Sequence, residues 1–162
     1  MIFEIINDID SDTVKNFATF LNENKPKKKS KIEILLNSNG GETEHSSAII
    51  HMINERKGKI KITAYGRIYS AAFELYVLAK CEKKILPDTI GMYHRATTEI
   101  NMTSGGKPKT SGDAANLKSL LADEKITKKV CKLANISNKA KAAIFADEDV
   151  YFTYEELKEM LM

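Results

Sequence analysis

Short apolar segments alternate along this chain with longer segments in which apolar residues recur every three or four positions. The short segments have the length and composition of β-strands, and the longer ones have the spacing of helices that cover a sheet. The expected strands lie at residues 2–6, 31–36, 59–64, 84–88 (with a turn) and 90–94. Strands and helices in alternation predict an α/β fold.

Residues that cap helices mark where several of these helices begin. Residues 10–12, Asp-Ser-Asp, precede the first helical pattern. Ser137 is expected to cap a short helix that ends at Phe145. Thr153 and Glu156 have the spacing of a capping box, which predicts the start of the last helix.

The most apolar helical segment covers residues 71–79, after the strand at 59–64 and an expected turn at Gly66. A helix that is apolar on nearly every face belongs in a core, and Glu74 within it is explained only if it faces a subunit boundary. Ser70 stands at its N-terminal end, where a serine most often serves as N-cap. The same position places a hydroxyl where free N–H groups favour developing negative charge. This segment alone leaves both interpretations open.

A glycine turn follows the second expected strand, where residues 37–41 read Asn-Ser-Asn-Gly-Gly. Two glycines let the backbone approach another group closely and direct N–H groups toward it. A tight strand-to-helix turn without any ligand explains the same residues. The spacing matches no nucleotide-binding motif, so no nucleotide site is predicted.

Size and charge limit the classes of function. The 162 residues with 43% hydrophobic content predict one globular domain. The net charge is +3, with 25 basic residues interspersed among 22 acidic ones, so neither nucleic acid nor a membrane surface is an expected partner.

The cysteines and histidines give no disulfide or metal pattern. Cys81 and Cys131 lie outside any C-x-x-C motif and are expected to be reduced thiols. His45 and His51 are six positions apart, not at the i, i+4 spacing of a metal pair, and are expected on the surface. Residues 1–5 lack the basic flank of a signal peptide and are too few to span a membrane. We therefore expect a cytoplasmic protein without metal or cofactor.

The region after the last expected strand changes character. Residues 97–112 are rich in Gly, Ser, Thr and Lys and predict a mobile loop or hairpin. From Asp113 a moderately amphipathic helix carries leucines among many lysines, which is typical of a projecting helix that meets a partner subunit. Apolar helix faces that one protomer leaves uncovered predict a homo-oligomer.

Three residues at the ends of regular elements have the side chains that a serine nucleophile needs. Ser70 supplies a hydroxyl, His94 an imidazole and Asp149 a carboxylate, although a solvated acidic turn also explains residues 147–149. A serine becomes nucleophilic when an imidazole takes its proton, and a carboxylate orients that imidazole. The glycine turn would supply N–H donors for the oxyanion.

Four segments, in order, resemble the proteolytic subunit of the Clp protease. Residues 37–41 read N-S-N-G-G where that family has N-S-P-G-G, and residues 66–72 read G-R-I-Y-S-A-A where it has G-x-x-x-S-M-G-A. Residues 92–95 read M-Y-H-R where it has M-I-H-Q-P, and residues 149–157 are similar to its segment D-x-x-x-S-A-x-E-A. The resemblance covers nearly the whole chain, and the departures delete none of the three site residues.

The resemblance implies a role for each of these residues. It makes Ser70 the nucleophile, His94 the general base and then acid, and Asp149 the orienting carboxylate. Backbone N–H groups of Gly41 and Ala71 would form the oxyanion hole. No cofactor and no metal are implied.

The resemblance also implies an architecture and partners. The fold would be a ClpP/crotonase-like spiral of ββα units, one domain over residues 1–162, with a protruding helical handle at about 97–133. In the family, handles join two rings into a barrel, and an AAA+ ATPase unfolds polypeptide substrates and threads them in. This chain begins at its first strand without the family's N-terminal pore loops, and it stops at the last helix. We expect a homo-oligomer, as a ring or double ring, and the missing loops argue against the usual ATPase partner.

Three functions remain as alternatives. The first is a serine endopeptidase that cleaves peptides or unfolded protein. The second is an inactive structural or regulatory subunit of such an assembly, because a triad must also be aligned to work. The third is a crotonase-type acyl-CoA enzyme, ranked last because that family acts through carboxylates rather than a Ser-His pair.

Overall fold

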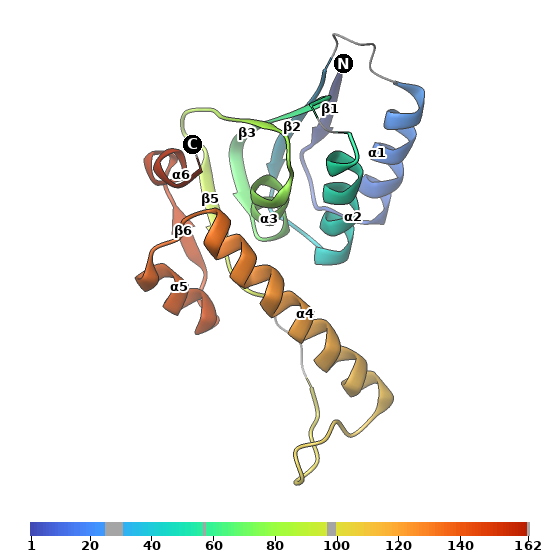
Figure 1. Ribbon diagram of the computed structural model, residues 1–162, viewed down its shortest axis with the longest axis vertical. Helices are drawn as coiled ribbons and strands as arrows, with labels where there is room; N and C mark the ends of the chain where they lie inside the picture. Colours follow the sequence, from blue (N-terminus) through green and yellow to red (C-terminus); the bar gives the residue numbers. More distant parts are fainter. Residues whose placement is uncertain (25–30, 57, 97–99, 162) are drawn as a thin grey trace.

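The computed structural model describes residues 1–24, 31–56, 58–96 and 100–161. These residues form six helices and one six-stranded sheet (Figure 1). The strands are β1 (Ile2–Ile5), β2 (Ile32–Ser38), β3 (Ile60–Tyr69), β4 (Glu82–Ile85), β5 (Ile90–Tyr93) and β6 (Val150–Phe152). The helices are α1 (Ser11–Glu23), α2 (Thr43–Asn54), α3 (Ala71–Leu78), α4 (Ser111–Leu133), α5 (Asn138–Phe145) and α6 (Tyr154–Leu161). The predicted α/β class is confirmed.

The sheet is built on β3, the longest strand. Its strand order is β1-β2-β3-β5-β6, and β4 also pairs with β3. β4 pairs with residues 61–64 of β3, and β5 pairs with residues 67–69, so these two short strands follow one another along β3. Pairing is parallel throughout, except that β6 runs antiparallel to β5. This arrangement brings the ends of β3, β5 and β6 together at one end of the sheet.

The expected turn at Gly66 is wrong, because β3 continues through this residue to Tyr69. Gly66 has φ +63°, and a Cβ atom there would lie 2.8 Å from Oδ1 of Asn37 on β2. The same oxygen accepts a hydrogen bond of 3.0 Å from the N–H of Arg67. The asparagine thus holds the glycine within the sheet, and the strand carries the chain as far as Ser70.

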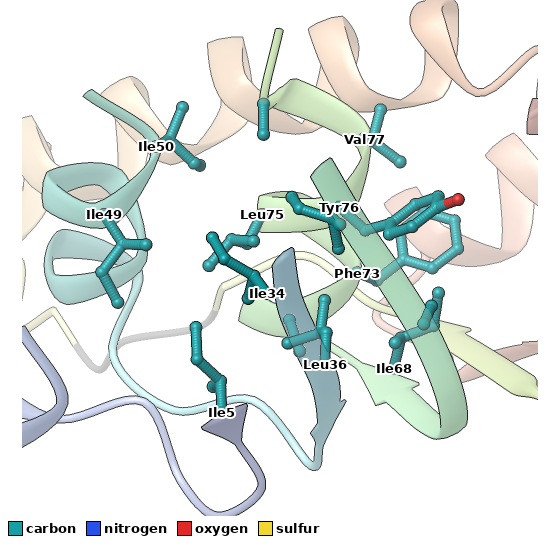
Figure 2. Close-up of a cluster of buried hydrophobic side chains, with 14 of the residues drawn as sticks. Ile5, Ile34, Leu36, Ile49, Ile50, Ile68, Phe73, Leu75, Tyr76 and Val77 are labelled. Atoms are coloured by element: carbon teal, nitrogen blue, oxygen red, sulfur yellow. The ribbon is translucent and has the colours of Figure 1, made fainter. Parts of the chain in front are cut away.

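Much of the core lies between the sheet and the helices α1–α3, which pack side by side (Figure 1). The same core also includes buried residues of α4, α5 and α6. Side chains from β2, including Ile34 and Leu36, meet side chains from α2 and α3 (Figure 2). Every residue of α3 from Ala71 to Val77 is buried, which confirms the predicted core helix. Its position in the core fixes the place of Ser70, the residue that precedes it.

The long helix α4 projects from the body of the protein (Figure 1). At 23 residues it is roughly 35 Å long. Its N-terminus is fixed by a capping box between Thr110 and Asp113. Asp113 is buried at this end, and toward its C-terminal end the helix is buried again at Thr127, Val130 and Cys131. The helix also contacts α3.

Most predicted helix starts are confirmed, and one strand was missed. Asp10, Ser137 and Thr153 each accept a hydrogen bond from the first turn of the helix that follows. The sequence analysis did not predict β6, because three residues are too few to show a period. No helix among the described residues is long and apolar enough to cross a membrane.

Candidate active site

Ser70 joins β3 to α3 in a backbone conformation that is rare for a residue with a side chain. Its φ is +50° and its ψ −119°, and such conformations cost about 1–3 kcal/mol. Its N–H donates to the carbonyl oxygen of Met92 at 2.8 Å, which ties this turn to β5. The Ser70 side chain makes no capping hydrogen bond to the described residues of α3. Its Oγ instead lies 2.8 Å from Nε2 of His94. Ser70 thus occupies the N-cap position, but the interpretation of its side chain as the helix cap is wrong.

His94 reaches Ser70 because of the register between two parallel strands. Tyr69, the last residue of β3, pairs with Met92 of β5. Ser70 follows the first strand at once, and His94 is two residues beyond Met92. Main-chain pairing therefore sets both side chains at the same end of the sheet, and the His94 side chain remains 38% exposed.

Asp149 is brought to His94 by the antiparallel strand β6. Tyr93 of β5 pairs with Val150 of β6. In an antiparallel register, the residue after Tyr93 faces the residue before Val150, and these are His94 and Asp149. Oδ1 of Asp149 lies 2.8 Å from Nδ1 of His94. Ser70, His94 and Asp149 therefore form one hydrogen-bonded row.

A second ion pair flanks this row. The guanidinium of Arg95 contacts both carboxylate oxygens of Asp147, with Nη2 to Oδ2 at 2.8 Å. The hydrogen bond from Arg95 holds the pKa of Asp147 below its ordinary value and raises the pKa of Arg95. Paired Arg95 and Asp147 tie the turn that carries Asp149 to the end of β5. Sequence reasoning missed this contact, because the two residues are far apart along the chain.

The glycine turn lies directly against Ser70. Gly40 has φ +102°, and a Cβ atom there would lie 2.7 Å from the carbonyl oxygen of Tyr69 and 3.0 Å from the nitrogen of Ala71. On its other side the turn is held by Ile9, whose N–H donates to the carbonyl of Gly40 at 2.7 Å. Only glycine allows the two segments to approach so closely.

Two backbone N–H groups near Ser70 have no acceptor among the described residues. They belong to Gly41 and Ala71. The N–H of Ile9 donates to the carbonyl of Gly40, and the carbonyl of Ile9 accepts from the N–H of Glu42. The N–H of Gly41, between these two residues, takes part in neither hydrogen bond. Ala71 is the first residue of α3, and the N–H groups of a first turn have no partner within the helix. Both residues line the cavity beside Ser70, where their N–H groups could stabilise a negatively charged oxygen.

That cavity has a volume of about 220 Å³. Its lining includes Ser70, Ala71, Glu74, His94 and Asp123. The carboxylate side chains come from α3 and α4, and Ser70 and His94 lie at the ends of β3 and β5. The cavity thus adjoins the hydrogen-bonded row and the two free N–H groups.

Glu74 is the most unusual residue of this cavity. It is only 3% exposed, and its Oε1 has no hydrogen-bond partner among the described residues. Burial in the first place, and then the charge of Asp123, raise the pKa of Glu74 to about 7. Burial also raises the pKa of Asp123. The sequence analysis noted the Glu74 charge within an apolar helix but could not place it.

One group of possible metal ligands occurs among the described residues, formed by Glu42, Glu44 and His45. Both carboxylates are exposed, and exposed acidic groups of this kind are common without a bound ion, so the group is not assigned as a metal site. His51 is exposed as predicted, whereas His45 is only partly exposed, with 21% of its side chain accessible.

Comparison of the structure with solved structures matches it to a mutant of ClpP1 from Listeria monocytogenes with a TM-score of 0.74. The match has 19% sequence identity and covers 98% of this chain and 86% of that chain. At this identity the match shows the fold, and the predicted ClpP-like fold is confirmed. Comparison with curated protein sequences gives no match. The model of the Clp protease family matches residues 1–159, nearly the whole chain. The chain therefore belongs to the Clp protease family.

Proposed function

We propose that this chain is a serine endopeptidase that hydrolyses peptides or unfolded polypeptides through an acyl-enzyme intermediate. The observation that carries the proposal is the row Ser70–His94–Asp149, with hydrogen-bonding distances of 2.8 Å at both steps. Membership of the Clp protease family supports the same reaction class.

In the first half of the reaction, Oγ of Ser70 attacks the carbonyl carbon of the scissile peptide bond. Nε2 of His94, 2.8 Å from that oxygen, takes its proton. Asp149 accepts a hydrogen bond from Nδ1–H of His94 and stabilises the imidazolium. His94 then gives the proton to the leaving amine, the C–N bond breaks, and an ester to Ser70 remains.

In the second half, water attacks the ester carbonyl and His94 takes its proton. His94 returns that proton to Oγ of Ser70 as the acid product leaves. In both halves the carbonyl oxygen becomes negative, and the N–H groups of Gly41 and Ala71 are the proposed donors to it. One such donor typically contributes a factor of about 10²–10³ in turnover.

The proposed working form is an assembly of identical chains in the cytoplasm, as a ring or double ring. The projecting helix α4 exposes Leu121 and Leu133, each more than half accessible in the single chain. Apolar side chains of this kind on a projecting helix suit contact with a neighbouring copy. Such an assembly would enclose the sites and restrict them to peptides and unfolded chains.

A fluorophosphonate probe tests the proposal, because it reacts only with an activated serine. We expect a covalent adduct at Ser70, located by mass spectrometry, and none in His94→Ala. Ser47→Ala is the matched control, since Ser47 is an exposed serine on α2 outside the row, and this variant should be labelled as the unaltered chain is.

Two other outcomes would point to other functions. Lack of any adduct at every pH between about 6 and 9 would support an inactive structural or regulatory subunit, because a serine that no base activates stays unreactive. Binding of an acyl-CoA without any adduct would support a crotonase-type enzyme. Either result would overturn the proposed peptidase.

A further inference from the structure

The cavity beside Ser70 carries two acidic side chains that the proposed reaction does not use. Glu74 is 3% exposed and Asp123 is half-buried, and both line the cavity. Neither forms an ion pair with a described residue, and Oε1 of Glu74 also lacks a hydrogen bond. A buried carboxylate without a partner is costly, so such groups are normally paired. These two carboxylates lack a partner of opposite charge.

The helix that follows Ser70 directs Glu74 to this place. The N–H of Glu74 donates to the carbonyl oxygen of Ser70 at 3.0 Å, so the two residues are one helical turn apart. Residues four apart lie on the same face of a helix, and their side chains lean toward its N-terminus. The carboxylate of Glu74 therefore extends toward the Ser70 end of α3. Asp123 approaches from α4, which contacts α3.

We propose that this cavity binds the side chain of lysine or arginine as the residue that precedes the scissile bond. The inference rests on the proposed function, because only an acyl-enzyme at Ser70 gives the cavity this role. In serine peptidases the pocket next to the nucleophile selects the substrate side chain by its shape and charge. Here the described lining of the pocket has two carboxylates and neither lysine nor arginine.

Size and charge both fit such a side chain. The cavity of about 220 Å³ equals the volume of roughly seven water molecules, more than one long side chain occupies. An ammonium or guanidinium group donates several hydrogen bonds, and carboxylate oxygens accept them. A cation between Glu74 and Asp123 would also offset the repulsion that contributes to the raised pKa of Glu74. An acidic or a purely apolar side chain would leave both carboxylates unpaired.

Two fluorogenic peptides that differ only at the residue before the scissile bond test this. One carries lysine there and the other carries norleucine, which has the same carbon chain without the ammonium group. We expect kcat/KM to be at least about 10-fold higher for lysine, and Glu74→Gln to lower this ratio by about 10- to 100-fold. Asp123→Asn should lower the ratio in the same direction.

Glu124→Gln is the matched control. It removes the same charge from the neighbouring position of α4, but Glu124 pairs with Lys128 and does not line the cavity. This variant should keep the ratio of the unaltered chain. An equal loss in Glu124→Gln and Asp123→Asn would overturn the inference, because general electrostatics would then explain the preference.

A binding measurement makes the test independent of turnover. Product peptides that end in lysine or norleucine are titrated calorimetrically into Ser70→Ala, and we expect tighter binding of the lysine peptide that is lost when Glu74→Gln is added. Probe labelling of Ser70 with no lysine preference would leave the proposed function standing and overturn the inference. Selective binding of the lysine peptide without any labelling would overturn the proposed function and retain the cation pocket.

Discussion

Replacement of Gly40 by alanine tests whether the glycine turn positions the site. The added Cβ would lie 2.7 Å from the carbonyl oxygen of Tyr69, 2.9 Å from Cβ of Ser70 and 3.0 Å from the nitrogen of Ala71. Two of these atoms belong to the backbone, so no side-chain rotation relieves the contact. The turn and the Ser70–Ala71 segment must move apart.

Two costs add up in this variant. Alanine at φ +102° is strained by about 1–3 kcal/mol. Overpacking in a well-packed region adds about 1–3 kcal/mol. We expect the free energy of unfolding to fall by about 2–6 kcal/mol. The movement also displaces the N–H of Ala71 or Gly41, and loss of one such donor lowers turnover by about 10²–10³.

Chemical denaturation measures the first effect, and the rate of fluorophosphonate labelling at Ser70 measures the second. Gly58→Ala is the matched control, because Gly58 has φ +72° but no atom within 4 Å of the position of its Cβ. Its free energy of unfolding should fall only by the strain of a left-handed residue, about 1–2 kcal/mol, and its labelling rate should not change.

The result that refutes this reasoning is a Gly40→Ala variant that labels within about twofold of the unaltered chain while it remains folded. The N–H groups beside Ser70 would then have no part in activating or stabilising the reaction. Equal losses of stability in the two glycine variants would show that backbone strain alone, and not the close approach to Ser70, requires Gly40.

Three further changes have distinct expected results. Asp149→Asn should lower turnover by about 10⁴ with little change in the unfolding midpoint, because the Asp149 side chain is 51% exposed. Phe73→Ala should lower the free energy of unfolding by about 3–5 kcal/mol in urea denaturation, since this fully buried ring stacks on Tyr93 and Phe152. Folding raises the pKa of Glu74 from 4.5 to about 7, so its contribution to stability is present below pH 4.5 and is lost as the pH rises through about 7. Between about pH 4.5 and pH 7 the free energy of unfolding of the unaltered chain should therefore fall by about 1–3 kcal/mol relative to that of Glu74→Gln, measured by denaturation at several pH values. Parallel plots of unfolding free energy against pH for the two chains would contradict the raised pKa.

The local patterns of the sequence predicted much of the fold. The alternation of strand and helix signals gave the α/β class, because the spacing of apolar residues directly reflects which face of each element is buried. The caps at Ser137 and Thr153 were predictable for a similar reason, since a helix N-terminus is satisfied by residues within one turn of it. Continuation of β3 through Gly66 was not, because it depends on Asn37 from another strand.

The candidate site shows the same division. The sequence singled out Ser70, His94 and Asp149, because these residue types follow or precede regular elements and fall in three of four ordered motifs. Two strand registers bring them together, that of β3 with β5 and that of β5 with β6. The strand β6 was not predictable from the spacing of apolar residues. Register is a property of paired strands, so no single segment contains it.

What the sequence by itself determined was the set of elements, the core helix after Ser70 and the residue types available for chemistry. Only the tertiary structure decided which of those residues are neighbours. It placed Ser70, His94 and Asp149 in one hydrogen-bonded row and paired Arg95 with Asp147. It also placed Glu74 in the lining of a cavity that Asp123 lines as well. The physical reason is range: helix and strand signals act over a few residues, whereas hydrogen bonds and burial at the site join residues that are up to 55 positions apart.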